Sequence, residues 1–146
     1  SPLAPPSISG TFYSSAILAT GPNDKVISEG DVNEQTQFIF ATLNAILSQL
    51  NATRSDILAM SAHVVDIHKN GEHVLAAHQG YMENEKRECP RSVCAWSMIG
   101  VSGLMPAKCV VQLEVKVMVR RGMMTNLITD RPAPRVPLDQ AAKSSL

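Results

Sequence analysis

Apolar residues recur along the chain with two different spacings, and the longer spacing marks two segments. Between residues 31 and 51, apolar side chains return every three or four positions, which is the spacing of one face of a helix. Asp31 and Glu34, three residues apart, resemble the capping pair that begins a helix, and Asn51 ends the pattern. The apolar positions that share this face are Ile39, Leu43, Ile46, Leu47 and Leu50.

The second segment with helical spacing covers residues 70–86. Its positions at intervals of three and four residues lie on one side of a helix. These positions are Val74, Ala77, His78, Tyr81 and Met82. The segment therefore predicts a second helix that packs with this face inward.

Four other segments are rich in β-branched, apolar and aromatic residues and are bounded by turn residues, as strands are. These predicted strands are residues 10–20, 56–67, 92–101 and 108–119. A short hairpin partner for the first strand is expected around Val26 and Ile27. Two amphipathic helices among these strands predict an α+β sandwich, in which both helices pack on one face of a mixed sheet.

The length of the chain fits one domain of ordinary size. We expect this domain to span residues 9–121. Residues 1–8 form a proline-rich lead-in and residues 122–146 a tail that contains several prolines near its start, and both are expected to be flexible.

Charge and cysteine content narrow the possible partners. The 146 residues include 13 Lys and Arg and 13 Asp and Glu, so the formal net charge of zero gives no electrostatic reason to expect nucleic acid or an anionic membrane. The sequence contains no run of about 18 apolar residues, so it predicts no membrane-spanning helix. Three cysteines without paired spacing indicate a reducing compartment, so we expect a cytoplasmic protein.

The four histidines do not predict a metal site. His63, His68, His73 and His78 recur every five residues, a spacing that walks around a helix. The series also crosses from a predicted strand into a predicted helix, so the four rings do not share one face. We expect neither a metal nor a cofactor.

The predicted sheet has a second face that needs cover. Residues 93–101 and 109–119 are apolar at both odd and even positions in places. A sheet with helices on one side and a partly apolar second face is usually buried against another chain. The sequence therefore predicts an oligomer, with a ligand site at the boundary between subunits.

The order and spacing of several segments together resemble the RidA/YjgF family of enamine and imine deaminases, also described as endoribonuclease L-PSP-like proteins. The resemblance covers roughly residues 9–121. The matching segments read TFYSSA, GDVNEQTQFIFATLNAILSQL, DILAMSAHVVDI, AAHQGYMEN, AWSMIGVSGLMP and VQLEVKVMVRR. The resemblance implies a chorismate-mutase-like fold and a homotrimer whose sheets form a central barrel, with small-molecule pockets between subunits.

One departure from the family concerns the arginine that grips the substrate carboxylate. When residues 99–101 and Leu104 are aligned with the family, Trp96 stands at the arginine position; a register with a six-residue insertion puts Arg91 there instead. We prefer the ungapped register. Tryptophan offers one N–H donor and a broad apolar face, whereas arginine makes a planar two-pronged contact. A role for Trp96 in core or interface packing is the alternative.

Other family positions also differ. By resemblance, Gln112 replaces the acid that positions water or protonates the substrate, and Glu114, two residues on, points the same way along its strand. His78 stands where the family has an asparagine, and a histidine can do acid–base work near neutral pH. Ser15 stands at the family's pocket serine, and Tyr13 lies near the place of its pocket tyrosine.

These positions give two groups of candidate residues. The candidate catalytic residues are His78, Gln112 and Glu114, and the candidate substrate-binding residues are Trp96, Ser15, Tyr13, Tyr81 and Arg91. Each has a plain structural alternative, since a histidine on an apolar helix face is often a buried packing residue and a strand glutamine is often solvated.

Three functions are compatible with these residues. The first is an enzyme that isomerises, cyclises or dehydrates a neutral enol, enamine or polyketide-like metabolite. The second is the family's ordinary hydrolysis of 2-imines or 2-enamines with release of ammonia, which depends on the Arg91 register. The third is a non-catalytic binding protein.

Overall fold

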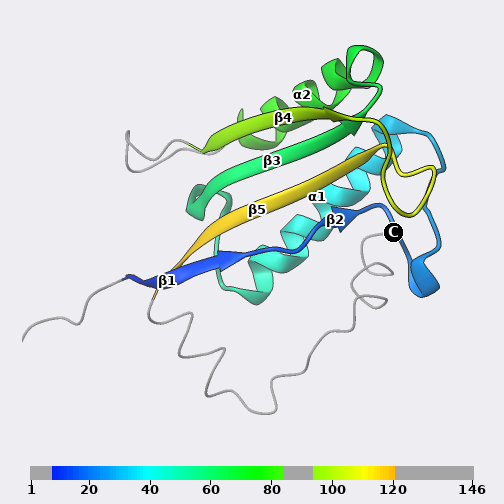
Figure 1. Cartoon of the computed structure of the whole chain (residues 1–146). Helices are drawn as coiled ribbons and strands as arrows, with labels where there is room; N and C mark the ends of the chain where they lie inside the picture. Colours follow the sequence, from blue (N-terminus) through cyan, green and yellow to red (C-terminus); the bar gives the residue numbers. More distant parts are fainter. Residues whose placement is uncertain (1–7, 84–93, 121–146) are drawn as a thin grey trace, which may run out of the picture.

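The computed structural model describes residues 8–83 and 94–120, which form one sheet and two long helices (Figure 1). In chain order the elements are β1 (Ile8–Tyr13), β2 (Ile17–Leu18), α1 (Val32–Gln49), β3 (Ile57–Val65), α2 (Ile67–Glu83), β4 (Ala95–Val101) and β5 (Val111–Arg120), with short 3-10 turns at Pro22–Asp24 and Arg54–Asp56. This order confirms the predicted α+β class.

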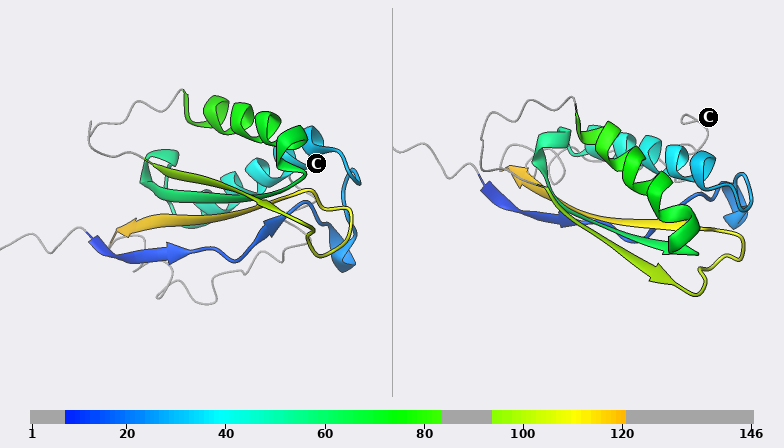
Figure 2. Two further views of the ribbon diagram at one scale, coloured as in Figure 1. Left: turned by 45° about the horizontal axis from the view of Figure 1, so that its top comes forward. Right: turned by 90° about the horizontal axis from the view of Figure 1, so that it is seen from above.

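The sheet is mixed, with the strand order β1-β5-β3-β4 and with β2 paired to β5 beyond the end of β1. β3 and β4 run parallel, and α2 makes the crossover between them; every other strand pair is antiparallel. Both helices lie on the same face of this sheet, as the views in Figure 2 show. The opposite face, which we call the open face, is covered by neither of the two described helices.

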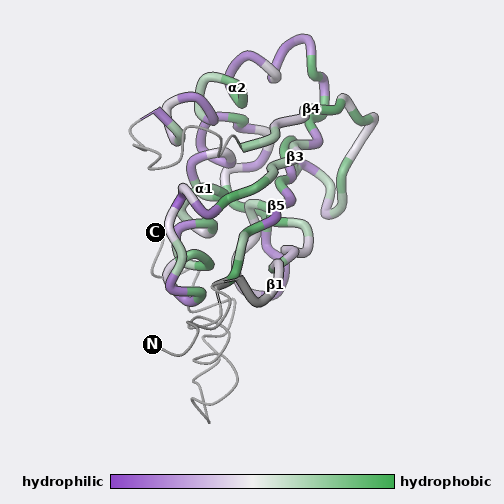
Figure 3. Tube along the Cα trace, turned by 90° about the vertical axis from the view of Figure 1, so that its left-hand side faces the viewer, coloured by the Kyte–Doolittle hydropathy of each residue, from purple (hydrophilic) through white to green (hydrophobic). Residues whose placement is uncertain are grey.

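The core lies between the helices and the covered face of the sheet. Alternate residues of β3 and β5 point into it because successive side chains of a strand point to opposite faces. The buried strand residues are Met60, Ala62, Val64, Val111, Leu113, Val115 and Val117, and α1 adds Ile39, Phe40, Leu43 and Leu47. Hydrophobic and hydrophilic segments alternate along both helices, as expected for helices with one buried side (Figure 3).

The predicted start of the first helix is confirmed. Asp31 is the N-cap of α1, and its side-chain oxygen accepts a hydrogen bond from the backbone N–H of Glu34 at 3.0 Å. The helix ends at Gln49, and Asn51 has a positive φ of 52°. Asparagine tolerates this left-handed conformation better than most residues, so it stops the helix at the place where the apolar pattern ends.

Two predicted boundaries are wrong, both because side chains form turns that the pattern did not reveal. The first predicted strand is split into β1 and β2, since Ser14 accepts the backbone N–H of Val115 through its hydroxyl at 2.9 Å and the chain bends there. The second helix begins at Ile67, before the predicted residue 70. The Asn70 side chain donates to the carbonyl of Val65 at 2.8 Å and so ties the first turn of this helix to the end of β3.

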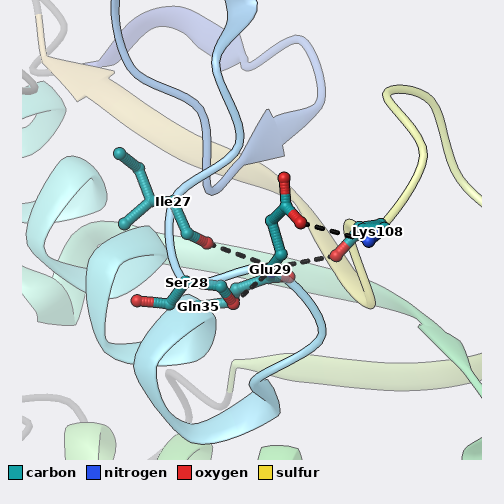
Figure 4. Close-up of polar contacts among 5 residues, drawn as sticks. All are labelled: Ile27, Ser28, Glu29, Gln35 and Lys108. Atoms are coloured by element: carbon teal, nitrogen blue, oxygen red, sulfur yellow. Dashed lines mark hydrogen bonds and ion pairs between the residues drawn. The ribbon is translucent and has the colours of Figure 1, made fainter.

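A buried amide joins α1 to the two loops beside it (Figure 4). The Gln35 side chain is fully buried, and its Nε2 lies 3.2 Å from the carbonyl oxygens of Ile27 and Ser28 and 3.0 Å from that of Lys108. Its Oε1 accepts the N–H of Val110 at 2.8 Å. One side chain therefore satisfies backbone groups from segments more than 70 residues apart in sequence.

An exposed ion pair lies beside this amide. Lys108 Nζ is 3.2 Å from a carboxylate oxygen of Glu29, and both side chains are more than half exposed. Exposed pairs of this kind add little stability, about 0–1 kcal/mol. The buried amide, and not the ion pair, is what holds the loops in place. Within residues 8–83 and 94–120, neither helix has the length and apolar character needed to cross a membrane.

Candidate functional site

The open face of the sheet carries rows of polar side chains that the strand registers bring side by side. Ser61 of β3 is directly opposite Ser97 of β4 on one side and Glu114 of β5 on the other. The hydroxyls of Ser61 and Ser97 are 3.3 Å apart. Directly opposite residues have Cβ atoms about 4.5–5.5 Å apart, so the three side chains form one continuous polar row.

A cavity of about 290 Å³ lies over this row. The residues that border it are Tyr13, Ser14, Ala59, Met60, Ser61, Ala95, Trp96, Ser97, Glu114, Val115 and Lys116. They come from four strands that the sequence separates by up to about 100 positions. Ligand pockets usually measure about 300–1,000 Å³, so this cavity lies at the lower limit of that range and suits only a small ligand.

Gln112 and Glu114 both lie on the open face, which confirms that their side chains point the same way along β5. The Gln112 amide nitrogen lies 3.5 Å from a carboxylate oxygen of Glu114, at the limit of a hydrogen bond. Glu114 is exposed and Gln112 is partly exposed. Both can therefore still bind a ligand or a second chain.

Lys116 is a cavity residue that the sequence analysis missed. Its ammonium nitrogen lies 5.3 Å from the ring centroid of Tyr13, within the range of a cation–π contact. The strand alternation that placed Gln112 and Glu114 on one face also places Lys116 there, so the signal was present in the sequence. Among the described residues that border the cavity, Lys116 is the cationic side chain and Glu114 the carboxylate.

Trp96 and His78 meet on the other, helix-covered side of the sheet. Their rings are stacked, with centroids 3.8 Å apart and planes inclined by 13°. Trp96 is opposite Met60, whose side chain is buried in the core, which fixes the face on which the indole lies. Burial lowers the pKa of the His78 imidazole, and its buried Nδ1 has no hydrogen-bond partner among the described residues.

Within one subunit, the candidate residues thus form two groups on opposite faces. Trp96 and His78 lie on the covered side, whereas Gln112 and Glu114 lie on the open side. The strand that carries Trp96, β4, is an edge strand and borders the open-face cavity as well. The two groups can share one ligand only around this edge or across a boundary between two copies.

Tyr81 is engaged in contacts between helices. Its hydroxyl donates to the Asn44 side chain at 2.7 Å, and its ring stacks on Phe40 with centroids 4.5 Å apart. The Arg54 guanidinium lies 4.0 Å from the centre of the same ring. Hydroxyl and ring both have partners inside the protein, and Tyr81 is nearly buried.

The remaining candidates lie apart from these groups. Ser15 is exposed in the break between β1 and β2, beside a groove of about 320 Å³ that runs along α1. Its neighbour Ser14, not Ser15, borders the open-face cavity. Arg91 lies outside the described residues. In the described part of the chain, no three His, Cys, Asp or Glu side chains are grouped as metal ligands.

The fold is that of a group of small α+β proteins with solved structures. The chain is similar to the Rid family protein YyfA from Yersinia pestis, with 24% identity, a TM-score of 0.64, and coverage of 75% of this chain and 81% of that one. It is also similar to a YjgF/YER057c/UK114 family member from Mycobacterium tuberculosis, with 20% identity, a TM-score of 0.58, and coverage of 75% and 79%. Comparison with curated proteins gave no match.

A family-level match agrees with these structures. Residues 7–120 match the family described as endoribonuclease L-PSP. The chain belongs to this family, which confirms the RidA/YjgF resemblance, and identities of 19–24% to the Mycobacterium tuberculosis, Yersinia pestis YyfA and yeast Mmf1 proteins make it a divergent member.

Proposed function

We propose that this protein is an enzyme that isomerises, cyclises or dehydrates a small neutral metabolite with enol or enamine character. The observation that carries the proposal is the Trp96–His78 stack on the covered side of β4, the edge strand that also borders the open-face cavity and at which the family resemblance calls for an arginine. An indole stacked on an uncharged imidazole offers an apolar wall and no grip for a carboxylate. An apolar ring or enone is the ligand that such a wall favours.

The state of His78 supports a role in proton transfer. Burial lowers its pKa, so the imidazole is neutral and able to accept a proton at physiological pH. Gln112 can hydrogen-bond a carbonyl or enol oxygen, because its amide both donates and accepts. Glu114, exposed beside it, is a second group that can take up a proton.

We place the pocket between copies of the chain, as a homotrimer would allow. The open face exposes large apolar side chains, with Tyr13 67% and Ile99 47% exposed. A second copy on this face would cover them and bring Gln112 and Glu114 toward the Trp96 edge of its neighbour. Balanced charge favours a small-molecule ligand over RNA, although the family carries an endoribonuclease description.

The proposal is tested with a panel of neutral cyclic enols and enamines, whose conversion is followed by proton NMR. We expect turnover that His78→Ala lowers about a hundredfold or more, the usual contribution of a general acid or base. Trp96→Ala should mainly raise KM, and sedimentation should show both variants as trimers. His68→Ala, at an exposed position of the same helix, is the matched control.

One result would assign the stack to packing instead. If His78→Ala remained fully active while Trp96→Ala dissociated the oligomer, the two rings would be part of a structural seam. A monomer of about 16 kDa at micromolar concentration would likewise contradict the pocket between copies, because interfaces of standard size persist at that concentration.

A second candidate function, hydrolysis of carboxylated 2-imines, is favoured by one observation. Lys116 borders the cavity and could bind a carboxylate in place of the family arginine. In this case an imine made from a common amino acid would release ammonia, and Lys116→Ala would reduce kcat/KM by about thirtyfold or more, since a lost charged contact costs about 2–5 kcal/mol. Lys25→Ala, at an exposed position outside the cavity, serves as control.

A further inference from the structure

His63 is a histidine of the open face to which the proposed chemistry gives no role. It lies on β3, directly opposite Ile99 of β4 and Gln112 of β5. Its flanking residues Ala62 and Val64 are fully buried on the covered side, so the imidazole points to the open side. It stands two residues beyond Ser61, which borders the open-face cavity, and is not itself one of the bordering residues.

The imidazole of His63 lacks a hydrogen bond that its surroundings call for. Its Nδ1 is buried and has no partner among the described residues. A buried polar atom without a partner costs about 1–3 kcal/mol, and most such atoms in native proteins are satisfied. The described residues therefore leave this nitrogen without the partner that its burial calls for.

Polar groups lie beside this imidazole on β3 and β5, whereas its direct neighbour on β4 is the apolar Ile99. Gln112 is its direct cross-strand neighbour, and Ser61 is two residues before it on β3. Glu114, opposite Ser61, is a diagonal neighbour, at the distance of about 7–8 Å that such pairs have. The strand registers thus gather an imidazole, an amide, a hydroxyl and a carboxylate from two strands.

We propose that His63 is a catalytic residue of the open-face site, where it transfers a proton to or from a small neutral carbonyl or enol compound. The inference rests on the proposed function and adds to it, because isomerisation needs one group that removes a proton and another that delivers one. His78 of a neighbouring copy supplies one such group across the boundary between copies that the proposed function assumes. His63 supplies the second, on the face that carries Gln112 and Glu114.

The chemistry of the site selects the ligand class. Glu114 and Lys116 carry opposite charges beside the cavity, so together they favour neither an anionic nor a cationic ligand over a neutral one. The serine hydroxyls and the Gln112 amide can bind two oxygens of one planar molecule. A β-dicarbonyl, which interconverts between an enol and a diketone, has two such oxygens.

The reaction balances without a co-reactant. The base takes the proton of the enol O–H, the electrons of that bond form the carbonyl, and the π electrons of the C=C bond form a C–H bond with a proton from the acid. One proton leaves oxygen and one arrives at carbon, so nothing is oxidised or reduced.

The experiment uses 2,4-pentanedione and the full-length chain. An enol-rich solution in an apolar solvent is diluted into buffer, and ketonisation is followed by the loss of enol absorbance. Binding is followed separately in ¹⁵N-labelled protein through the imidazole signals of the four histidines. The variants are His63→Gln, which keeps a hydrogen-bonding group, and His63→Asn, with His68→Asn as the matched control at an exposed position.

We expect the probe to shift the His63 signals and the chain to accelerate ketonisation. Both His63 variants should lose about a hundredfold in rate while His68→Asn keeps the full rate. Ketonisation at full rate in both His63 variants would overturn the inference and leave the proposed function standing. Shifted His63 signals without catalysis would keep the ligand site but refute the catalytic role and the proposed function for this class. Unshifted signals together with no catalysis would overturn both.

Discussion

The polar side chains on the two faces of the sheet differ in whether they have hydrogen-bond partners within the described residues. On the covered face, the buried side chains of Gln35 and Asn70 both hydrogen-bond to backbone groups. On the open face, the buried nitrogen of His63 has no partner in the described chain, and Gln112 and Glu114 make only one long contact with each other. Gln35 and Asn70 thus find their partners within the chain, whereas His63 does not find one among the described residues.

This difference separates the groups that hold the fold from the groups that are available for function. Buried polar groups with complete partners stabilise one arrangement, whereas unsatisfied groups in native proteins often mark a ligand or a partner. His78 is the exception on the covered face, because its buried Nδ1 also lacks a partner. It lies at the edge strand, where the two faces meet.

The largest expected effect is on the covered face, at Gln35. Gln35→Leu keeps the approximate volume but leaves the Ile27 carbonyl and the Val110 N–H unsatisfied, whereas the carbonyls of Ser28 and Lys108 still accept the N–H groups of Asp31 and Gly30. Since each unsatisfied buried group costs about 1–3 kcal/mol, we expect a loss of about 3–5 kcal/mol in the free energy of unfolding, measured by urea denaturation.

Gln37→Leu is the matched control for this prediction. Gln37 is exposed on the same helix, so its substitution should change stability by less than about 0.5 kcal/mol. Equal losses of the free energy of unfolding in the two variants would show that the hydrogen bonds of the buried Gln35 amide add no special stability. Substitution of the exposed Ser97 on the open face by alanine should also have a small effect, which sharpens the contrast.

A smaller effect is expected where β4 touches α2. A Cβ added to Gly100 would lie 2.9 Å from Cγ2 of Ile67 and 3.3 Å from its Cβ, so Gly100→Ala forces the helix and strand apart. Overpacking of this kind costs about 1–3 kcal/mol. Gly103→Ala, where no atom lies within 4 Å of the added Cβ, should be nearly neutral in the same urea titration. If Gly100→Ala left the free energy of unfolding unchanged, the contact between β4 and α2 would have room for the added methyl group.

Much of the fold could be predicted because its elements depend on local pattern. The helical spacing of Ile39 and Leu43 and the Asp31 cap predicted α1. The alternation of side chains along β5 predicted that Gln112 and Glu114 lie on one face. The boundaries at Ser14 and Asn70 could not be predicted, since both depend on a side chain that bonds to a distant or preceding backbone group.

The candidate site was harder to predict than the fold, because it depends on which strands are neighbours. The sequence pattern put His78 on an inner helix face and Trp96 on a strand, but only the crossover through α2 brings the two rings together. In the sequence, His63 stands out only as one of four histidines spaced five residues apart. Its functional setting follows from the registers that place it beside Gln112, and no local signal carries that information.

The smallest expected effect is a change of stability with pH that comes from His78, the covered-face imidazole whose Nδ1 has no partner among the described residues. Burial lowers the pKa of His78 below its usual value of about 6.5, so the unfolded chain binds a proton more readily than the folded one. Stability should therefore fall as the pH drops through 6.5 toward the lowered pKa, and should not depend on His78 above this window. Because the ring is only partly buried, the change should be smaller than either effect above.

His78→Gln should flatten the slope of the free energy of unfolding against pH in urea titrations between pH 5 and 7.5, while His68→Gln should keep it. The emission of Trp96, the chain's only tryptophan, reports the stack directly. An unchanged slope in His78→Gln would mean that the imidazole is solvated and that the covered face has no unsatisfied histidine.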